Sequence, residues 1–191
     1  MMTKPRLGDM TRTAVGEQDF EVLYHEHVSR IYNFFRYRFG DGSLAEDLTS
    51  VTFEKAWKNR ERYRRDLASF STWLFTVARN LYTSWCRHRS VDATRVVDAP
   101  ESWPPPAPGE SPFEAAARNE TERRLERALA RLPLADRELL LMIVIGGLSH
   151  SEAAGVIGLR PEVLRKRLQR ARERLAAALD AEGALGRRKV G

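Results

Sequence analysis

The sequence predicts an all-α protein of two small helical domains, which a proline-rich flexible linker joins. The first observation is that apolar residues recur at helical intervals between residues 20 and 89, and again from Leu125 to Leu132. The second is that six of the nine prolines fall between residues 100 and 112, a segment that can form neither a helix nor a central strand. Neither half shows the alternating pattern of a strand bounded by turn residues.

These observations divide the chain into five segments. Pro133 also separates two helices within the second domain, one ending near Leu132 and one at about residues 135–145. The expected segments are a disordered N-terminal segment at 1–18, a first helical domain at 19–92, the acidic linker at 93–113, a second helical domain at 114–180 and a basic C-terminal tail at 181–191.

The composition favours a polyanionic partner and argues against a membrane protein. The 191 residues include 32 Lys and Arg against 26 Asp and Glu, a formal charge of +6. The longest apolar run, residues 139–145, is far shorter than the roughly 18 residues of a membrane span, and the N-terminus lacks the apolar core of a signal peptide. We therefore expect a cytoplasmic protein without membrane insertion.

The residues that usually carry catalysis or bind metals are sparse and scattered. The single cysteine, Cys86, excludes an intramolecular disulfide and a zinc site of several thiolates, and the four histidines lack metal-ligand spacing. An enzyme acting on nucleic acid would need a carboxylate cluster for metal ions or an activated nucleophile, and neither is present. We expect no metal, no cofactor and no enzymatic activity.

A helix-turn-helix is predicted in the second domain. Ser149 and Glu152 have the spacing of a capping box, so a helix should begin at His150. Gly158 can adopt the left-handed conformation that ends this helix, and Pro161 suits the start of the next one.

The second helix of this motif carries a concentrated positive charge. Residues 160–174 include seven basic and two acidic residues, whereas a solvated helix would normally alternate the two signs. Leu164, Leu168, Ala171 and Leu175 form its buried stripe, which leaves the opposite face free to enter a major groove. We expect Arg165 and Lys166 to read guanine and Gln169 to read adenine, while the phosphate contacts come from Arg167, Arg170, Arg172 and Arg174.

Residues 58–65 combine basic side chains with an aromatic ring. Five of these eight residues are Lys or Arg, and Tyr63 lies among them. Basic residues interleaved with aromatic residues suit single-stranded DNA, because guanidinium groups follow the phosphates while rings stack on unpaired bases.

Two sets of motifs resemble a known family, the bacterial RNA polymerase sigma factors, and in particular their extracytoplasmic-function subfamily. The resemblance to region four rests on GLSHSEAA at 147–154, IGL at 157–159 and VLRKRLQRAR at 163–172. The resemblance to region two rests on FEVLY at 20–24, AEDLTSVTFEKAW at 45–57 and FSTWLFTVARN at 70–80. Together the motifs cover about residues 20–92 and 114–180.

The resemblance implies a factor that binds core RNA polymerase and gives it promoter specificity. The minus-thirty-five element would be recognised as duplex by the helix-turn-helix, and the minus-ten element as a melted strand by the first domain. It places Tyr63, Arg64, Arg65 and Asn80 at the pocket for a flipped base, with Thr83, Ser84 and Arg87 on the following turns. The subfamily also implies an anti-sigma factor as a partner.

The resemblance assigns the helix around residues 47–57 to docking on the clamp helices of the largest catalytic subunit of the polymerase. Asp47, Ser50 and Glu54 form a polar stripe at helical spacing, and Leu48 and Val51 can serve the core or a partner groove. The sequence has Ser50 and Val51 where the family commonly has Gln and Glu.

A second hypothesis is a stand-alone helix-turn-helix regulator whose first domain senses a signal or dimerises. Such a regulator would bind an operator without polymerase. A sigma factor alone should show little specific binding.

Overall fold

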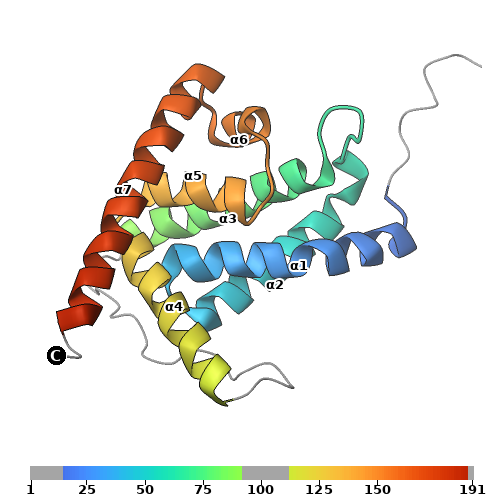
Figure 1. The fold of residues 1–191 in the computed structure, drawn as a ribbon. Coiled ribbons are helices and arrows are strands. Elements are labelled where there is room, and N and C mark those ends of the chain that lie inside the picture. The colour runs from blue at the N-terminus through green and yellow to red at the C-terminus, as the bar shows by residue number, and fades with distance from the viewer. Residues whose placement is uncertain (1–14, 92–111, 189–191) are drawn as a thin grey trace, which may run out of the picture.

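The computed structural model describes residues 15–91 and 112–188, and the side chains of residues 15–86 and 120–183 (Figure 1). The described residues are helical apart from short connections, as the sequence predicts. The N-terminal half contains α1 (Glu17–Phe39), α2 (Gly42–Lys58), the short 3-10 helix η1 (Arg60–Arg62) and α3 (Phe70–Val91). The C-terminal half contains α4 (Pro112–Ala130), α5 (Leu134–Val144), α6 (His150–Ile157) and α7 (Pro161–Arg188).

Local signals at a tight turn join α1 and α2. Gly40 ends α1 in the left-handed conformation, with φ 74°. The side chain of Asp41 then accepts a hydrogen bond from the Leu44 amide at 3.0 Å and begins α2. The turn folds α2 back along α1, and α3 packs against both helices.

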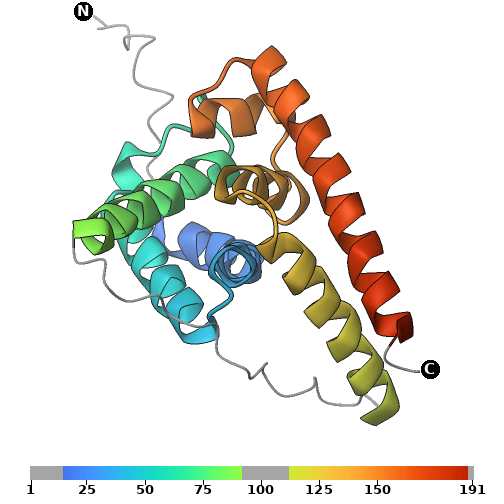
Figure 2. The same ribbon diagram turned by 90° about the vertical axis from the view of Figure 1, so that its left-hand side faces the viewer.

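The predicted helix-turn-helix is confirmed. Ser149 and Glu152 form a complete capping box at the start of α6, and Gly158 ends that helix with φ 78°. The next helix begins at Pro161, as expected. Figure 2 shows α4 and α7 side by side, and α5 and α6 both pack on α7.

The two halves pack on each other and share one hydrophobic core. Phe34 and Phe75 of the N-terminal half and Leu139 and Met142 of the C-terminal half are fully buried members of the same cluster. The sequence predicts two helical domains, but it does not predict this direct packing between them.

Some segment predictions fall outside the described residues. The structure does not describe residues 1–14, 92–111 and 189–191, so most of the expected N-terminal segment and of the expected linker lies outside it. Helix α7 continues to Arg188 and so includes most of the segment 181–191, where the basic C-terminal tail is expected. None of the helices in the described part of the chain is both long and apolar enough to cross a membrane.

Candidate nucleic-acid interface

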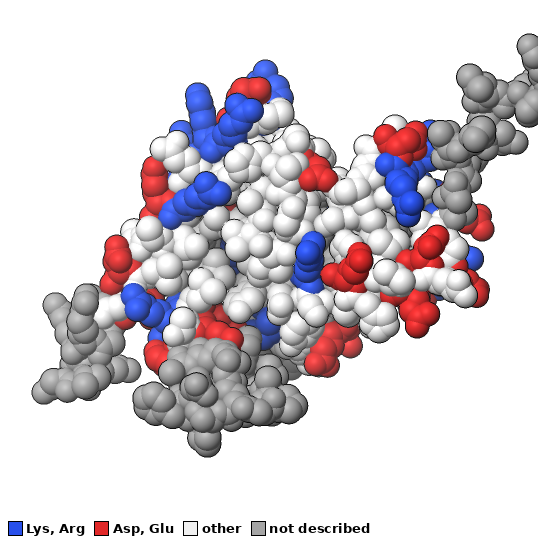
Figure 3. All heavy atoms as spheres, turned by 45° about the vertical axis from the view of Figure 1, so that its right-hand side comes forward, with Lys and Arg blue, Asp and Glu red and all other residues white. Residues whose placement is uncertain are grey.

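The start of α7 presents the basic face that the sequence predicts. Leu164, Leu168 and Ala171 are buried against the rest of the C-terminal half. The side chains pointing away from them are exposed, and they are Arg165, Lys166, Gln169, Arg170 and Arg172. Figure 3 shows Lys and Arg side chains gathered at the end of the molecule where α7 begins. This face therefore has the shape and charge to enter a major groove.

Asp136 of α5 separates the arginines of α7 into two groups. Its carboxylate is buried, accepts a hydrogen bond from Arg167 Nε at 3.0 Å and pairs with Arg174. Arg167 is expected to contact a phosphate, but in this structure its side chain holds α7 against α5. The other described basic residues at the start of α7 face solvent away from Asp136, and they are Arg165, Lys166, Arg170 and Arg172.

The predicted minus-ten residues on α3 are only partly accessible in the described structure. Asn80 and Ser84 are exposed, and Thr83 is half-buried. The side chain of Arg87 lies outside the described residues. Before α3, Arg65 is exposed and Arg64 forms two hydrogen bonds with Asp66, at 3.0 and 2.9 Å.

Tyr63 requires a correction, because its ring is buried rather than available for stacking on a base. Only 6% of the residue is exposed, and its hydroxyl donates to the Ala68 carbonyl at 3.2 Å. The ring packs against Phe70 and Trp73, with centroids 5.5 and 5.3 Å away. Tyr63 therefore anchors the loop before α3 to the core.

The polar stripe on α2 is exposed as predicted. Asp47, Ser50 and Glu54 all face solvent, and Val51 is half-buried. Lys58 pairs with Glu54 and lowers the pKa of that carboxyl through a hydrogen bond. Leu48, expected as a possible partner contact, is buried in the core and holds α2 in place instead.

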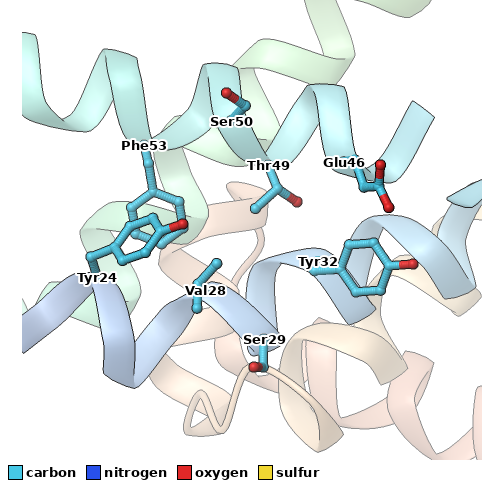
Figure 4. Close-up of a pocket in the computed structure, with 8 residues that line it drawn as sticks. All are labelled: Tyr24, Val28, Ser29, Tyr32, Glu46, Thr49, Ser50 and Phe53. Carbon is cyan, nitrogen blue, oxygen red and sulfur yellow. The ribbon is translucent and has the colours of Figure 1, made fainter. Parts of the chain in front are cut away.

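A pocket of about 530 Å³ lies beside this stripe, between α1 and α2 (Figure 4). Tyr24 and Phe53 form its aromatic end, with ring centroids 4.7 Å apart, and Ser50 lies on its rim. The other lining residues are Val28, Ser29, Tyr32, Glu46 and Thr49. The exposed polar stripe thus lies next to a hollow that has both aromatic and polar lining residues.

Polar residues that the sequence analysis missed connect the two halves. Glu138 of α5 accepts hydrogen bonds from Arg79, at 2.8 Å, and from Tyr82, both on α3. Glu152 of α6 accepts from Ser69 and Thr72, each at 2.7 Å. The sequence does contain a signal for the buried role of Glu138, because this acidic residue comes directly before the apolar run 139–145.

These contacts change the ionisation of the groups that make them. The hydrogen bond from Thr72 is the main cause that lowers the pKa of Glu152 to about 2, and Ser69 and Ser149 add to it. Burial raises the pKa of Tyr82. Glu152 is therefore a stable carboxylate, and Tyr82 stays a neutral hydrogen-bond donor.

Comparisons with known proteins connect these surfaces with one family. The family model described as "Sigma-70 region 2" matches residues 23–91, and the model described as "Sigma-70, region 4" matches residues 122–175. The RNA polymerase sigma factor CarQ of Myxococcus xanthus is 32% identical over 171 residues, which are 89% of this chain and 95% of CarQ. RfaY of Xanthomonas campestris is 33% identical over 135 residues, 69% of this chain, but the match spans only 33% of that protein's length.

A solved structure supports the same assignment. It is the sigma factor RpoE of Bartonella quintana in complex with the anti-sigma factor NepR, with 25% identity and a TM-score of 0.69. The match covers 85% of this chain and 98% of the RpoE chain. The two region matches, the CarQ match and this fold show that the chain belongs to the bacterial RNA polymerase sigma factors of the extracytoplasmic-function (ECF) subfamily.

Proposed function

We propose that this ECF sigma factor recognises the minus-thirty-five element as duplex DNA with α7 and captures the minus-ten element as a melted strand with α3. The observation that carries the proposal is the exposed face of Arg165, Lys166 and Gln169 at the start of a helix seated by a capped α6. Arg170 and Arg172 flank this face and suit phosphate contacts. The factor itself is not a catalyst and works in the cytoplasm, bound to core polymerase.

Run-off transcription on a promoter library tests the proposal directly. Bacterial core polymerase should give specific transcripts only when the protein is added, and the purified protein alone should not select an operator from the same library. Strong sequence-specific binding by the protein alone, with no effect on polymerase, would favour the stand-alone regulator instead.

Strand capture is assigned to the exposed part of α3. Asn80 and Ser84 are exposed on this helix, and Thr83 lies between them in the sequence. Asn80→Ala should leave the closed complex nearly intact and reduce the open complex roughly five-fold to a hundred-fold, because a good pair of side-chain hydrogen bonds to a base is worth ~1–3 kcal/mol.

Permanganate reactivity of unpaired thymines measures that loss on duplex and premelted templates. A premelted template should recover part of the signal. Gln18→Ala, which removes an exposed amide from α1, is the matched control and should behave as wild type. Equal thymine reactivity for Asn80→Ala and wild type on the duplex would remove Asn80 from the strand-capture surface.

Docking on the clamp helices of the polymerase is assigned to the face of α2 that carries Asp47, Ser50 and Glu54. These side chains are exposed together, and the pocket between α1 and α2 lies beside them. A triple alanine variant should bind core polymerase more weakly in a pull-down titration. The control is a triple alanine variant of Glu17, Asp19 and Glu21 on α1, which are also exposed. Unchanged affinity of the folded Asp47, Ser50 and Glu54 variant would move the docking face elsewhere.

An anti-sigma factor is proposed as a further partner. The support is the similarity in fold to RpoE of Bartonella quintana, whose structure contains the anti-sigma factor NepR. The exposed α2 stripe and the neighbouring pocket offer such a partner the same surface as the polymerase, so the two should compete for this sigma factor.

A further inference from the structure

We infer that Asp136 of α5 is a positioning residue for DNA recognition, which keeps Arg167 and Arg174 of α7 away from the DNA phosphates. Asp136 thereby limits the sequence-independent affinity of this sigma factor for DNA. The consequence for DNA binding rests on the proposed function, in which α7 enters the major groove. The ion pairs themselves are a feature of the C-terminal half alone.

Asp136 is a buried carboxylate that two arginines of another helix share. Only 3% of the residue is exposed, and α5 packs on α7 (Figure 1). Arg167 Nε donates to its Oδ1 atom at 3.0 Å, and Arg174 Nη1 donates to its Oδ2 atom. Asp136 also lies in the first turn of α5, where the partial positive charge of a helix N-terminus favours an acid. Each carboxylate oxygen thus holds its own arginine.

The two arginines are much less buried than the acid that holds them. The side chain of Arg167 is 37% exposed and that of Arg174 is 54% exposed, against 4% for Asp136. Both guanidinium groups would therefore reach water or a phosphate if the carboxylate released them. Moving either one to a phosphate leaves the buried charge of Asp136 with one partner fewer, which is strongly destabilising. The ion pairs therefore prevail over a phosphate contact at the surface.

The positions of these arginines on α7 show which DNA contacts are withheld. Relative to the buried Leu164, Arg172 lies about 80° to one side of the helix axis. Arg167 and Arg174 lie about 60° and 80° to the other side. A helix in the major groove has a phosphate backbone on each side. Arg172 is exposed toward one backbone, whereas Asp136 occupies the arginines that would face the other.

Withholding these arginines reduces the part of DNA binding that does not depend on sequence. Each phosphate that a protein cation neutralises releases counterions, so the logarithm of the binding constant falls with the logarithm of the salt concentration, with a slope of ~0.9 per phosphate. Two further arginines at the backbone would add ~1.8 to this slope. Phosphate contacts carry no sequence information, so recognition by α7 depends more on base edges while Asp136 holds both arginines.

The salt dependence of binding to an arbitrary DNA duplex tests the inference. The probe is a fluorescein-labelled duplex of about 20 base pairs without a promoter sequence, titrated with the full-length protein at about 50 to 200 mM salt. Asp136→Asn keeps the shape of the side chain and removes its charge, so one or both arginines should reach a phosphate. Binding at low salt should tighten and the slope should steepen by ~0.9–1.8, so the affinity lost across this salt range should grow about 3.5-fold to 12-fold.

Arginine variants identify the groups that gain the contact. In the otherwise wild-type protein, Arg167→Ala should leave the slope unchanged, because Asp136 already occupies Arg167. In the Asp136→Asn background, Arg167→Ala should lower the slope by ~0.9. A merely structural role of Asp136 would give the opposite result, because Asp136→Asn would then weaken DNA binding. Circular dichroism checks folding, and if Asp136→Asn does not fold, the slope of Arg167→Ala decides. A lower slope for Arg167→Ala in the wild-type background would overturn the inference.

Glu182→Gln is the matched control. Glu182 is also buried and is also shared by two arginines, Arg127 and Arg131. It lies about 15 residues after Arg167, or ~22 Å farther along α7, away from the start of the helix that reads DNA. Glu182→Gln changes the net charge by the same amount as Asp136→Asn and should leave the slope unchanged. An equal rise in slope for both variants would show a general effect of charge and overturn the inference.

Arg172→Ala separates this inference from the proposed function. Arg172 is exposed, so its loss should lower the slope of the wild-type protein by ~0.9 if α7 carries the DNA contact. If Arg172→Ala leaves the slope unchanged, α7 is not the DNA-binding helix, and the proposed function and the inference both fail. If Arg172→Ala lowers the slope but folded Asp136→Asn does not steepen it, the inference alone is overturned.

Discussion

The contact between Thr72 and Glu152 gives the sharpest quantitative test of the packing between the two halves. Thr72 Oγ1 donates to Glu152 Oε1 at 2.7 Å, across the boundary between α3 and α6. Thr72→Val keeps the shape and the β-branching of the side chain and removes only the donor. A hydrogen bond to a charged group contributes ~1.5–3 kcal/mol, and we expect ~1.5 kcal/mol because Glu152 also bonds Ser69 and Ser149.

The pH dependence of this loss has a defined sign. The pKa of Glu152 is about 2 in the folded protein, below its ordinary value of 4.5, with the Thr72 hydrogen bond as the main cause. The stabilisation is therefore fully present above about pH 4.5 and is lost as the pH falls toward 2. The difference in the free energy of unfolding between wild type and Thr72→Val should be constant near neutral pH and should shrink in acid.

Urea unfolding of the full chain at pH 7 and pH 3 measures both effects. A double-mutant cycle with Glu152→Ala isolates the pairwise coupling from the loss of the capping box. Thr76→Val is the matched control, since Thr76 bonds only the Thr72 carbonyl of its own helix in the described hydrogen bonds. A coupling energy below ~0.3 kcal/mol at pH 7 would refute the view that this contact joins the halves.

Three further predictions test the core, a buried histidine and the recognition helix. Phe75→Ala should cost ~3–5 kcal/mol in urea unfolding, because the ring is fully buried and packs against Phe34 at 5.3 Å; a loss below 1 kcal/mol would contradict this. Burial lowers the pKa of His27 below 6.5, so its stabilising effect is present above that pH and lost as the pH falls; His27→Leu should flatten the stability profile below pH 7. Arg165→Ala should weaken binding to the minus-thirty-five element by ~1–3 kcal/mol and relax the base preference at one position in a selection experiment. Arg172→Ala should instead weaken binding to all DNA sequences alike. An unchanged selected motif would reassign Arg165 to the phosphates.

Local signals explain why the helix-turn-helix could be predicted in detail. The capping box of Ser149 and Glu152, the left-handed Gly158 and the start at Pro161 each depend on residues a few positions apart. The same holds for the buried stripe of α7, where Leu164 and Leu168 repeat at helical spacing. Such features follow from the sequence without knowledge of the tertiary structure.

Side chains whose surroundings come from distant segments could not be placed in the same way. Tyr63 lies in a basic, polar stretch, yet Phe70 and Trp73 cover its ring. Arg167 lies among residues that the sequence predicts to face DNA, yet Asp136 of α5, 31 positions earlier, binds it. A helical pattern shows which stripe is buried but not which element covers it, so Leu48 had two interpretations until α2 was seen packed on the core.

The surface between the two halves combines a shared apolar core with buried polar contacts. A purely apolar surface would lose its whole hydrophobic stabilisation on separation, which is ~25 cal/mol for every Å² exposed to water. Buried charges behave differently, because Glu138 and Arg79 regain hydration when they separate, and this offsets much of the interaction that they lose. Glu152, Ser69 and Thr72 lie near the protein surface and are hydrated even more readily. The polar contacts thus give the packed halves a defined register, and the apolar residues of the shared core, Phe75 among them, supply the hydrophobic stabilisation.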